Sequence, residues 1–216
     1  MISFNIFKKL DYFDIDIAVD FEGGILVIEG ESGAGKTTIL DCIAGLKCPD
    51  RGTITIGDRI LYSSDKNINL AVKDRNIGYS FQNYALFPHM SVMDNVVYSL
   101  KCKGIQDFSY AERIMDSFGI YHIKDKLPKT ISGGEKQRTA LARAIASKPS
   151  LLLLDEPFSA LDRNTKASVY EEFLNFKEHF HMDTILITHD EKEATLLGDK
   201  IIKMKDGKII HTSELL

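Results

Sequence analysis

The chain has 216 residues, of which 44% are hydrophobic and 27% are charged, and its formal net charge is −4. This length and composition indicate one globular domain with a substantial core, and the acidic balance argues against a surface that binds nucleic acid. The longest apolar runs are much shorter than the roughly 20 residues of a membrane-spanning helix, so work at a membrane would require another polypeptide. Three cysteines, none of them in a CxxC pair, predict buried thiols rather than disulfides or a zinc site.

Apolar patterning in the first third of the chain predicts mainly β-structure. Alternation near the N-terminus predicts strands with one buried face, whereas the continuous run Ile25–Ile28 predicts a strand covered on both faces. A glycine-rich loop then leads into a helix from about Lys36 to Gly45. The expected strands are residues 2–6, 15–19, 25–28, 53–56 and 60–62, the last two as a hairpin.

The rest of the chain alternates between helical patterns and buried strands. The helical pattern of residues 84–149, broken by glycine and proline, predicts an inserted α-helical subdomain. Around it we expect strands at 77–81, 151–154 and 184–188, helices at 162–179 and 191–197, and a final hairpin across Asp206-Gly207. Buried strands alternating with helices predict an α/β fold with a mostly parallel sheet, built from residues 1–83 and 150–216. The N-terminal strands are expected to add an antiparallel β-subdomain.

Residues 30–37 match the pattern G-x-x-x-x-G-K-[ST] between a predicted buried strand and a helix. Such a loop turns several backbone N–H groups toward a phosphate, and the following helix adds the positive end of its dipole. Lys36 would reach the β- and γ-phosphates of a nucleotide, and the Thr37 hydroxyl would ligate Mg²⁺. The sequence therefore predicts a P-loop NTPase. The residues expected to bind ATP in this loop are Gly30, Glu31, Ser32, Gly33, Ala34, Gly35, Lys36, Thr37 and Thr38.

Two acidic residues, Asp155 and Glu156, follow the buried run Leu151–Leu154. In open α/β sheets, ligands bind at the carboxyl ends of the strands. Asp155 is therefore predicted to lie near the metal, and Glu156 to face the water beyond the γ-phosphate as a general base. Taken alone, the pair could also be an acidic turn after a core strand, but the upstream phosphate loop favours the catalytic interpretation.

The segment Ser132-Gly133-Gly134-Glu135 precedes an amphipathic helical pattern, and its S-x-x-E spacing predicts a capping box. A helix that begins in this way also presents N–H groups and a hydroxyl to an anion. Together with the two motifs above, this segment resembles the signature of the ABC ATPase family, usually written L-S-G-G-Q. The resemblance implies that Ser132, Gly133 and Gly134 bind the γ-phosphate of ATP held by the opposite subunit. Ile131 and Glu135 depart from the usual Leu and Gln.

Further family elements follow in order along the chain. Gln82 resembles the glutamine that links Mg²⁺ to the helical subdomain, residues 159–162 resemble the D-loop that contacts the partner's site, and His189 resembles the switch histidine that touches the γ-phosphate. Taken alone, Gln82 would be a surface residue and His189 a structural one. In the family an aromatic residue stacks on adenine, but for each candidate in this chain a place in the hydrophobic core is the favoured interpretation. The candidates are Phe7, Tyr12 and Phe13.

The resemblance implies a homodimer that sandwiches two ATP molecules, each with Mg²⁺. The metal ligands would be Thr37, Gln82 and Asp155, and the residues that take part in hydrolysis would be Glu156, His189 and Lys36. The resemblance also implies integral-membrane permease partners and, beyond them, an extracytoplasmic solute-binding protein. No nucleic acid partner is expected, and the chain would lie peripherally at the cytoplasmic face of the cell membrane.

The family has several functional classes, and two stretches favour the importers. Residues 84–92 resemble importer ATPases for oxyanions, metals and polyamines, and residues 59–78 most resemble those of molybdate or tungstate importers. The alternatives are a division-type signalling ATPase that docks on a membrane partner without transport, and an exporter ATPase. A generic P-loop kinase is a further alternative, and Ser132→Arg should leave a kinase active but inactivate an ABC ATPase.

Overall fold

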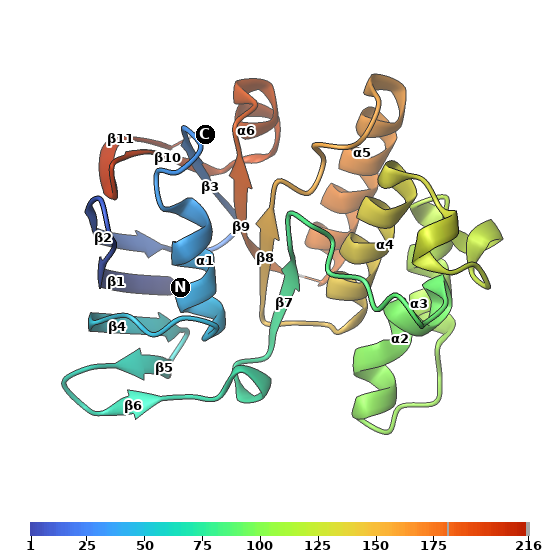
Figure 1. The fold of residues 1–216 in the computed structure, drawn as a ribbon, viewed down its shortest axis with the longest axis horizontal. Helices are drawn as coiled ribbons and strands as arrows, with labels where there is room; N and C mark the ends of the chain where they lie inside the picture. The colour runs from blue at the N-terminus through green and yellow to red at the C-terminus, as the bar shows by residue number, and fades with distance from the viewer. Residues whose placement is uncertain (181, 215–216) are drawn as a thin grey trace. The chain divides into compact units, whose positions relative to one another are not determined.

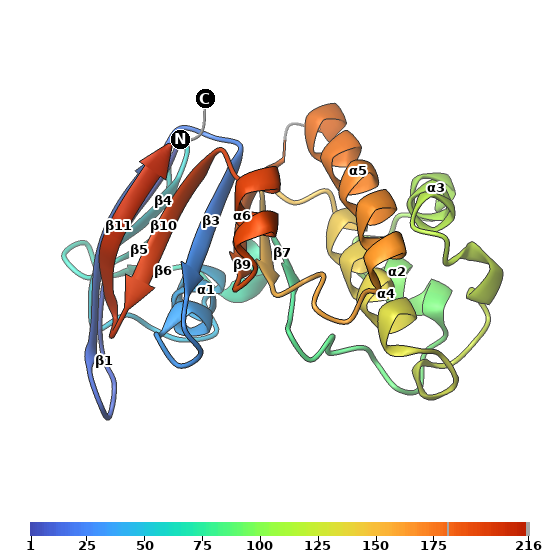
Figure 2. The ribbon, with the colours of Figure 1, turned by 90° about the horizontal axis from the view of Figure 1, so that it is seen from above.

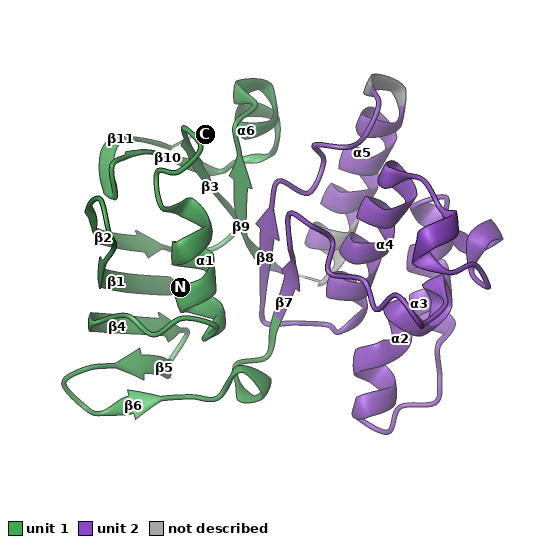
Figure 3. Ribbon diagram, viewed as in Figure 1, with its two compact units in different colours: residues 1–77, 183–216 green, residues 78–182 purple. Residues whose placement is uncertain are grey.

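The computed structural model of the chain describes residues 1–180 and 182–214. Contacts within the chain divide it into two compact units, coloured separately in Figure 3. Unit 1 comprises residues 1–77 and 183–216, and unit 2 comprises residues 78–182. None of the helices in the described part of the chain is long and apolar enough to cross a membrane.

Unit 1 contains an antiparallel five-stranded sheet, as the N-terminal alternation predicted. Its strands, in sheet order, are β2 (Asp14–Phe21), β1 (Ile2–Lys9), β4 (Arg51–Ile56), β5 (Arg59–Ser63) and β6 (Ile68–Asn69). Every second residue of β2 is buried, from Ile15 to Phe21, so this face of the sheet belongs to the core. Strand β6 was not predicted, because two residues are too short to show any periodicity.

The second group of strands in unit 1 carries the phosphate loop. These strands are β11 (Lys208–Glu214), β10 (Lys200–Lys205), β3 (Ile25–Gly30) and β9 (Asp183–Thr188), and they are adjacent in that order. Strand β3 runs parallel to both β10 and β9, and Figure 2 shows β11, β10 and β3 side by side. The four apolar residues at the start of β3 are fully buried, which confirms that this strand is covered on both faces. The helices of unit 1 are α1 (Lys36–Ala44), η1 (Val72–Asp74) and α6 (Glu191–Leu197).

Unit 2 combines two strands with the predicted helical region (Figure 1). The strands are β7 (Ile77–Ser80) and β8 (Leu151–Asp155), and all five residues of β8 are buried. Helices α2 (Val92–Cys102) and α3 (Ser109–Ser117) pack against α4 (Gly133–Ala146). The remaining helices are η2 (Tyr121–Ile123), η3 (Pro128–Thr130) and α5 (Arg163–Phe180).

The expectation that the thiols are buried is correct for one cysteine only. Cys42 lies on the buried face of α1, and burial raises the pKa of its thiol to about 11. Cys48 and Cys102 are exposed, because one lies in the loop after α1 and the other is the last residue of α2. Counting and spacing cysteines could not separate these environments.

Candidate functional site

The phosphate loop of unit 1 closes on its own lysine. The Lys36 ammonium donates hydrogen bonds to the carbonyl oxygens of Gly30 and Glu31, at 2.7 and 2.8 Å. Two of the loop glycines are required by the backbone, because Gly33 and Gly35 have φ values of 85° and 97°. Gly30 is required by space, because a Cβ atom there would lie 2.5 Å from the carbonyl oxygen of Met204 on β10.

The hairpin turn at the end of β10 supports this loop from the side. The Gly207 N–H donates to the carbonyl oxygen of Ala34 at 3.2 Å, and the Gly207 carbonyl accepts from the Asp16 N–H at 3.0 Å. The turn that was predicted from Asp206-Gly207 therefore connects the phosphate loop with β2. A side chain at position 207 would collide with the backbone of Asp14, so this contact depends on glycine.

The three aromatic candidates for adenine lie in different surroundings. The ring of Phe13 comes within 3.4 Å of the position that a Cβ atom would occupy at Gly35, so it lies beside the phosphate loop. Tyr12 is 96% exposed. Phe7 is on β1, where the guanidinium of Arg51 lies 4.4 Å from its ring centroid. Of the three, Phe13 is the residue for which the structure gives a position beside the phosphate loop.

The opposite end of helix α1 is held by Arg75, which is 1% exposed. Its guanidinium donates to the carbonyl oxygens of Cys42 and Ile43 at 3.0 and 2.8 Å, and to the Asn69 amide oxygen at 2.8 Å. These bonds satisfy carbonyl groups that a helix leaves without partners in its last turn. Burial lowers the pKa of Arg75, yet it supplies a cation at the negative end of the helix dipole. No local pattern of residues predicts this role.

His189 lies at the carboxyl end of β9, as predicted. Its backbone is fixed from both sides, because the Thr188 hydroxyl donates to the Glu193 carboxylate at 2.6 Å and Asp190 caps α6. The imidazole is exposed and lines a cavity of about 380 Å³ within unit 1 together with Gly30 and Glu31. The structure thus brings His189 and the start of the phosphate loop to one cavity.

In unit 2, the two predicted carboxylates lie at the end of strand β8 and directly after it. Asp155 is 3% exposed at the end of the strand, and Glu156 follows it with a φ of 49°. The Gln82 side-chain amide donates to the Glu156 carboxylate at 3.3 Å. Two of the predicted site residues, Gln82 and Glu156, are therefore in direct contact although 74 residues separate them in the sequence.

The capping box predicted at the start of α4 is present. The Ser132 hydroxyl accepts from the Glu135 N–H at 3.3 Å, and the Glu135 carboxylate accepts from the Ser132 N–H at 2.7 Å and from its hydroxyl at 2.8 Å. These hydrogen bonds hold the pKa of Glu135 below its ordinary value. The departure of Glu135 from the usual glutamine therefore places a carboxylate on the signature serine. Gly133 and Gly134 complete the first turn of the helix.

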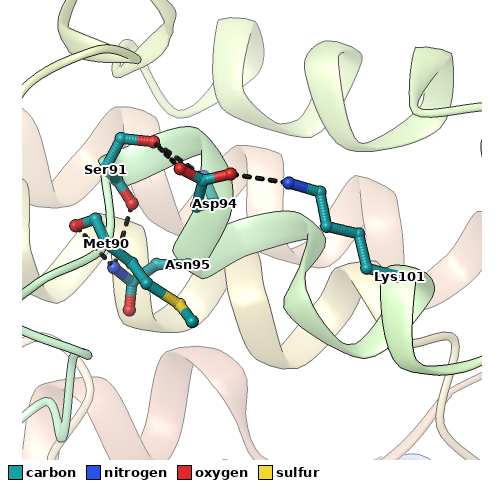
Figure 4. A network of polar contacts seen from close by, with 5 residues as sticks. All are labelled: Met90, Ser91, Asp94, Asn95 and Lys101. Atoms are coloured by element: carbon teal, nitrogen blue, oxygen red, sulfur yellow. Dashed lines mark hydrogen bonds and ion pairs between the residues drawn. The ribbon is translucent and has the colours of Figure 1, made fainter.

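The loop after Gln82 is shaped by Asn95, which sequence reasoning did not single out. Asn95 is 0% exposed; its amide oxygen accepts from the Phe87 N–H at 2.8 Å, and its amide nitrogen donates to the Met90 and Ser91 carbonyls at 3.2 and 2.9 Å. Figure 4 shows this amide turned toward Met90 and Ser91, with an outer pair between Asp94 and Lys101. One buried side chain therefore fixes residues 87–91.

The predicted metal ligands and the loop suit the groups expected of them. Thr37, Gln82 and Asp155 offer hydroxyl, amide and carboxylate oxygens, the donor types that Mg²⁺ prefers. Glycines in the left-handed backbone conformation and the lysine of the loop form a site that suits a phosphate group. The loop, Thr37 and His189 belong to unit 1, whereas Gln82, Asp155, Glu156 and the start of α4 belong to unit 2.

Comparisons with known proteins identify a family for this chain. The family model described as ABC transporter matches residues 15–159. The molybdate/tungstate import ATP-binding protein WtpC of Pyrococcus horikoshii is 41% identical over 90% of this chain and 55% of its own length. The spermidine/putrescine import ATP-binding protein PotA of Marinobacter nauticus is 40% identical over 94% of this chain and 52% of its own length. The chain thus spans about half the length of these curated relatives.

A solved structure extends the likeness to the whole fold. It is the dimeric ATP-binding cassette MJ0796 in a post-hydrolysis state bound to ADP and phosphate. It has a TM-score of 0.84 and 27% sequence identity, and the match covers 100% of this chain and 99% of that one. This likeness confirms the predicted fold, a P-loop NTPase core with an antiparallel β-subdomain and a helical insert.

Proposed function

This chain belongs to the ABC transporter family of ATPases, and on this basis we propose that it is the ATP-binding and hydrolysing subunit of a membrane importer. One observation carries the proposal beyond a generic P-loop enzyme. The chain has, besides its phosphate loop, a second anion-binding element in the capped Ser132-Gly133-Gly134 turn of α4. A P-loop kinase has no need of such a surface.

Nucleotide binding is assigned to the loop and its neighbours. The backbone N–H groups of residues 30–35 and the Lys36 ammonium bind the β- and γ-phosphates, so Lys36 exchanges the carbonyls of Gly30 and Glu31 for phosphate oxygens. Phe13 stacks on the adenine ring. Thr37, Gln82 and Asp155 would be the ligands of Mg²⁺, which when bound would neutralise charge on the phosphates.

Hydrolysis is assigned to three side chains of the site. The Glu156 carboxylate accepts the proton of the water that attacks the γ-phosphate, and the hydrogen bond from Gln82 orients that carboxylate. His189 contacts the γ-phosphate, and Lys36 stabilises the negative charge on it. The remaining stabilisation comes from Ser132, Gly133 and Gly134 of the opposite subunit, so two copies of the chain form a homodimer around two ATP molecules.

The transport partners follow from the importer assignment. The chain docks at the cytoplasmic face of the membrane onto permease subunits, which receive solute from an extracytoplasmic binding protein. We assign an oxyanion, molybdate or tungstate, as the solute. Two points support this assignment: residues 59–78 resemble molybdate or tungstate importer ATPases, and one relative is named for molybdate/tungstate import. A relative named for polyamine import is almost equally identical.

Steady-state ATP hydrolysis by purified protein tests the enzymatic part. The wild type is expected to hydrolyse MgATP, Glu156→Gln to retain nucleotide binding without turnover, and Lys36→Ala to lose binding. Ser132→Arg is expected to abolish hydrolysis as well, because the signature surface acts on the partner's γ-phosphate. Full activity of Ser132→Arg would instead indicate a P-loop enzyme that works without this surface.

Co-purification tests the transport part. Tagged Glu156→Gln protein, held with ATP in detergent-solubilised membranes, is expected to capture a multi-span permease, and the ligand of the accompanying binding protein would identify the solute. Capture of division proteins alone would contradict import while leaving ATP hydrolysis unaffected.

A further inference from the structure

The buried side chain of Gln137 connects helix α4 with the loop that follows β8, residues 156–160, which we call the catalytic loop. Gln137 lies on α4, three residues after Gly134, and is 2% exposed. Its amide nitrogen donates to the Glu156 carbonyl at 3.0 Å and to the Ser159 hydroxyl at 3.3 Å. Its amide oxygen accepts from the Ala160 N–H at 3.0 Å. One side chain therefore contacts both ends of the segment 156–160.

The backbone of Glu156 is in a conformation that requires such support. Its φ of 49° lies in the left-handed region, which is costly for a residue with a side chain. Its carbonyl oxygen accepts from the Gln137 amide and also from the Ser159 N–H and hydroxyl, at 3.3 and 3.1 Å. This carbonyl is thus the point at which the strained turn after β8 is held in place.

The contacts of Gln137 are well suited to aim the Glu156 carboxylate. Gln137 holds the backbone carbonyl of Glu156 itself. A rotation of this peptide group would therefore move the Glu156 side chain away from Gln82. The efficiency of a general base depends on such geometry, because a displacement of about 1 Å can cost roughly 100-fold in rate.

We propose that Gln137 is a positioning residue for Glu156, and that through it the signature end of α4 sets the orientation of the general base. This inference rests on the proposed function, in which Glu156 activates the attacking water. Gln137 is not assigned any contact with nucleotide. Its effect is therefore expected in the chemical step and not in nucleotide binding by the phosphate loop.

The test compares Gln137→Met, which keeps length but loses all three hydrogen bonds, with Thr139→Val as a matched control. Thr139 is fully buried on the same helix, and its hydroxyl donates to the Glu135 carbonyl of that helix at 2.7 Å. Gln137→Met is expected to lower kcat by about 100-fold while the Kd for MgATP stays within about 3-fold of wild type. Thr139→Val should leave kcat near the wild-type value.

A double variant separates positioning from general damage. If Gln137 acts through Glu156, adding Gln137→Met to Glu156→Gln should leave the residual single-turnover rate unchanged. Gln137→Asn, which keeps the amide on a shorter side chain, serves as the second variant if the methionine protein does not fold. It is likewise expected to lower kcat while the Kd for MgATP stays near the wild-type value.

The outcomes distinguish the inference from the proposed function. A kcat of Gln137→Met or Gln137→Asn equal to that of Thr139→Val would overturn the inference alone. A further loss of rate in the Glu156→Gln background would also overturn it. A wild type without ATP hydrolysis, or a Glu156→Gln protein as active as wild type, would overturn the proposed function and the inference with it.

Discussion

At the residue scale, Phe13 is distinguished from the other aromatic candidates by its contact with the end of the phosphate loop. Phe13→Ala is expected to weaken MgATP binding by roughly 1–3 kcal/mol, because one face of the adenine would lose its stacking partner. The control is Phe7→Ala, which removes the ring under Arg51 and should leave ATP affinity unchanged. Titration of a fluorescent ATP analogue measures both, and equal effects of the two variants would contradict the assignment.

Glu135 is the second residue whose role can be isolated. Its pKa is depressed by the hydrogen bonds from Ser132, so the folded state holds the proton less tightly than the unfolded state. Its contribution to stability is therefore present above its ordinary pKa of 4.5 and is lost as the pH falls through the depressed value.

Glu135→Gln is expected to lower the free energy of unfolding at pH 7 by roughly 0.3–1 kcal/mol, because the charge at the helix N-terminus is removed. Urea unfolding at pH 7 and at acid pH checks this, and the difference between wild type and variant should shrink in acid. A difference that stays constant with pH would show that the carboxylate charge plays no part.

At the scale of elements, the loop 87–91 depends on one side chain at the start of α2. Asn95→Leu is expected to lower the stability of the protein by about 1–3 kcal/mol, because the part-buried Phe87 N–H and Met90 carbonyl lose their hydrogen bonds to the Asn95 amide. Lys101→Met breaks an exposed ion pair of the same helix and should cost about 0–1 kcal/mol. Thermal unfolding compares the two, and an equal loss in both would contradict the role given to Asn95.

The same elements show how far sequence reasoning could go. All strands except β6, the phosphate loop and the capping box were predictable, because their signals lie within a few consecutive residues, as Ser132 and Glu135 illustrate. Gln137, Asn95 and Arg75 were not singled out. Arg75 meets carbonyl groups more than 30 residues away, and Gln137 meets Glu156 at a separation of 19 residues. Only folding brings these partners together, although the i, i+3 spacing of Gly134 and Gln137 does place both on one face of α4.

At the scale of the whole molecule, the chain carries one phosphate loop and one signature turn, so the proposed function requires two copies for a complete site. ATP then acts as the ligand that stabilises the dimer, and hydrolysis removes the γ-phosphate on which the contact depends. Slowing hydrolysis should therefore trap the dimer, whereas blocking the signature turn should prevent it.

The molar mass of the Glu156→Gln protein in solution, measured by light scattering with and without ATP, tests this claim most directly. We predict a monomer without nucleotide, a dimer with ATP, and a monomer in ATP when Ser132→Arg is added. A Glu156→Gln protein that binds ATP but remains a monomer, or a Ser132→Arg variant that dimerises equally well, would contradict an ATP site completed by the partner's signature turn.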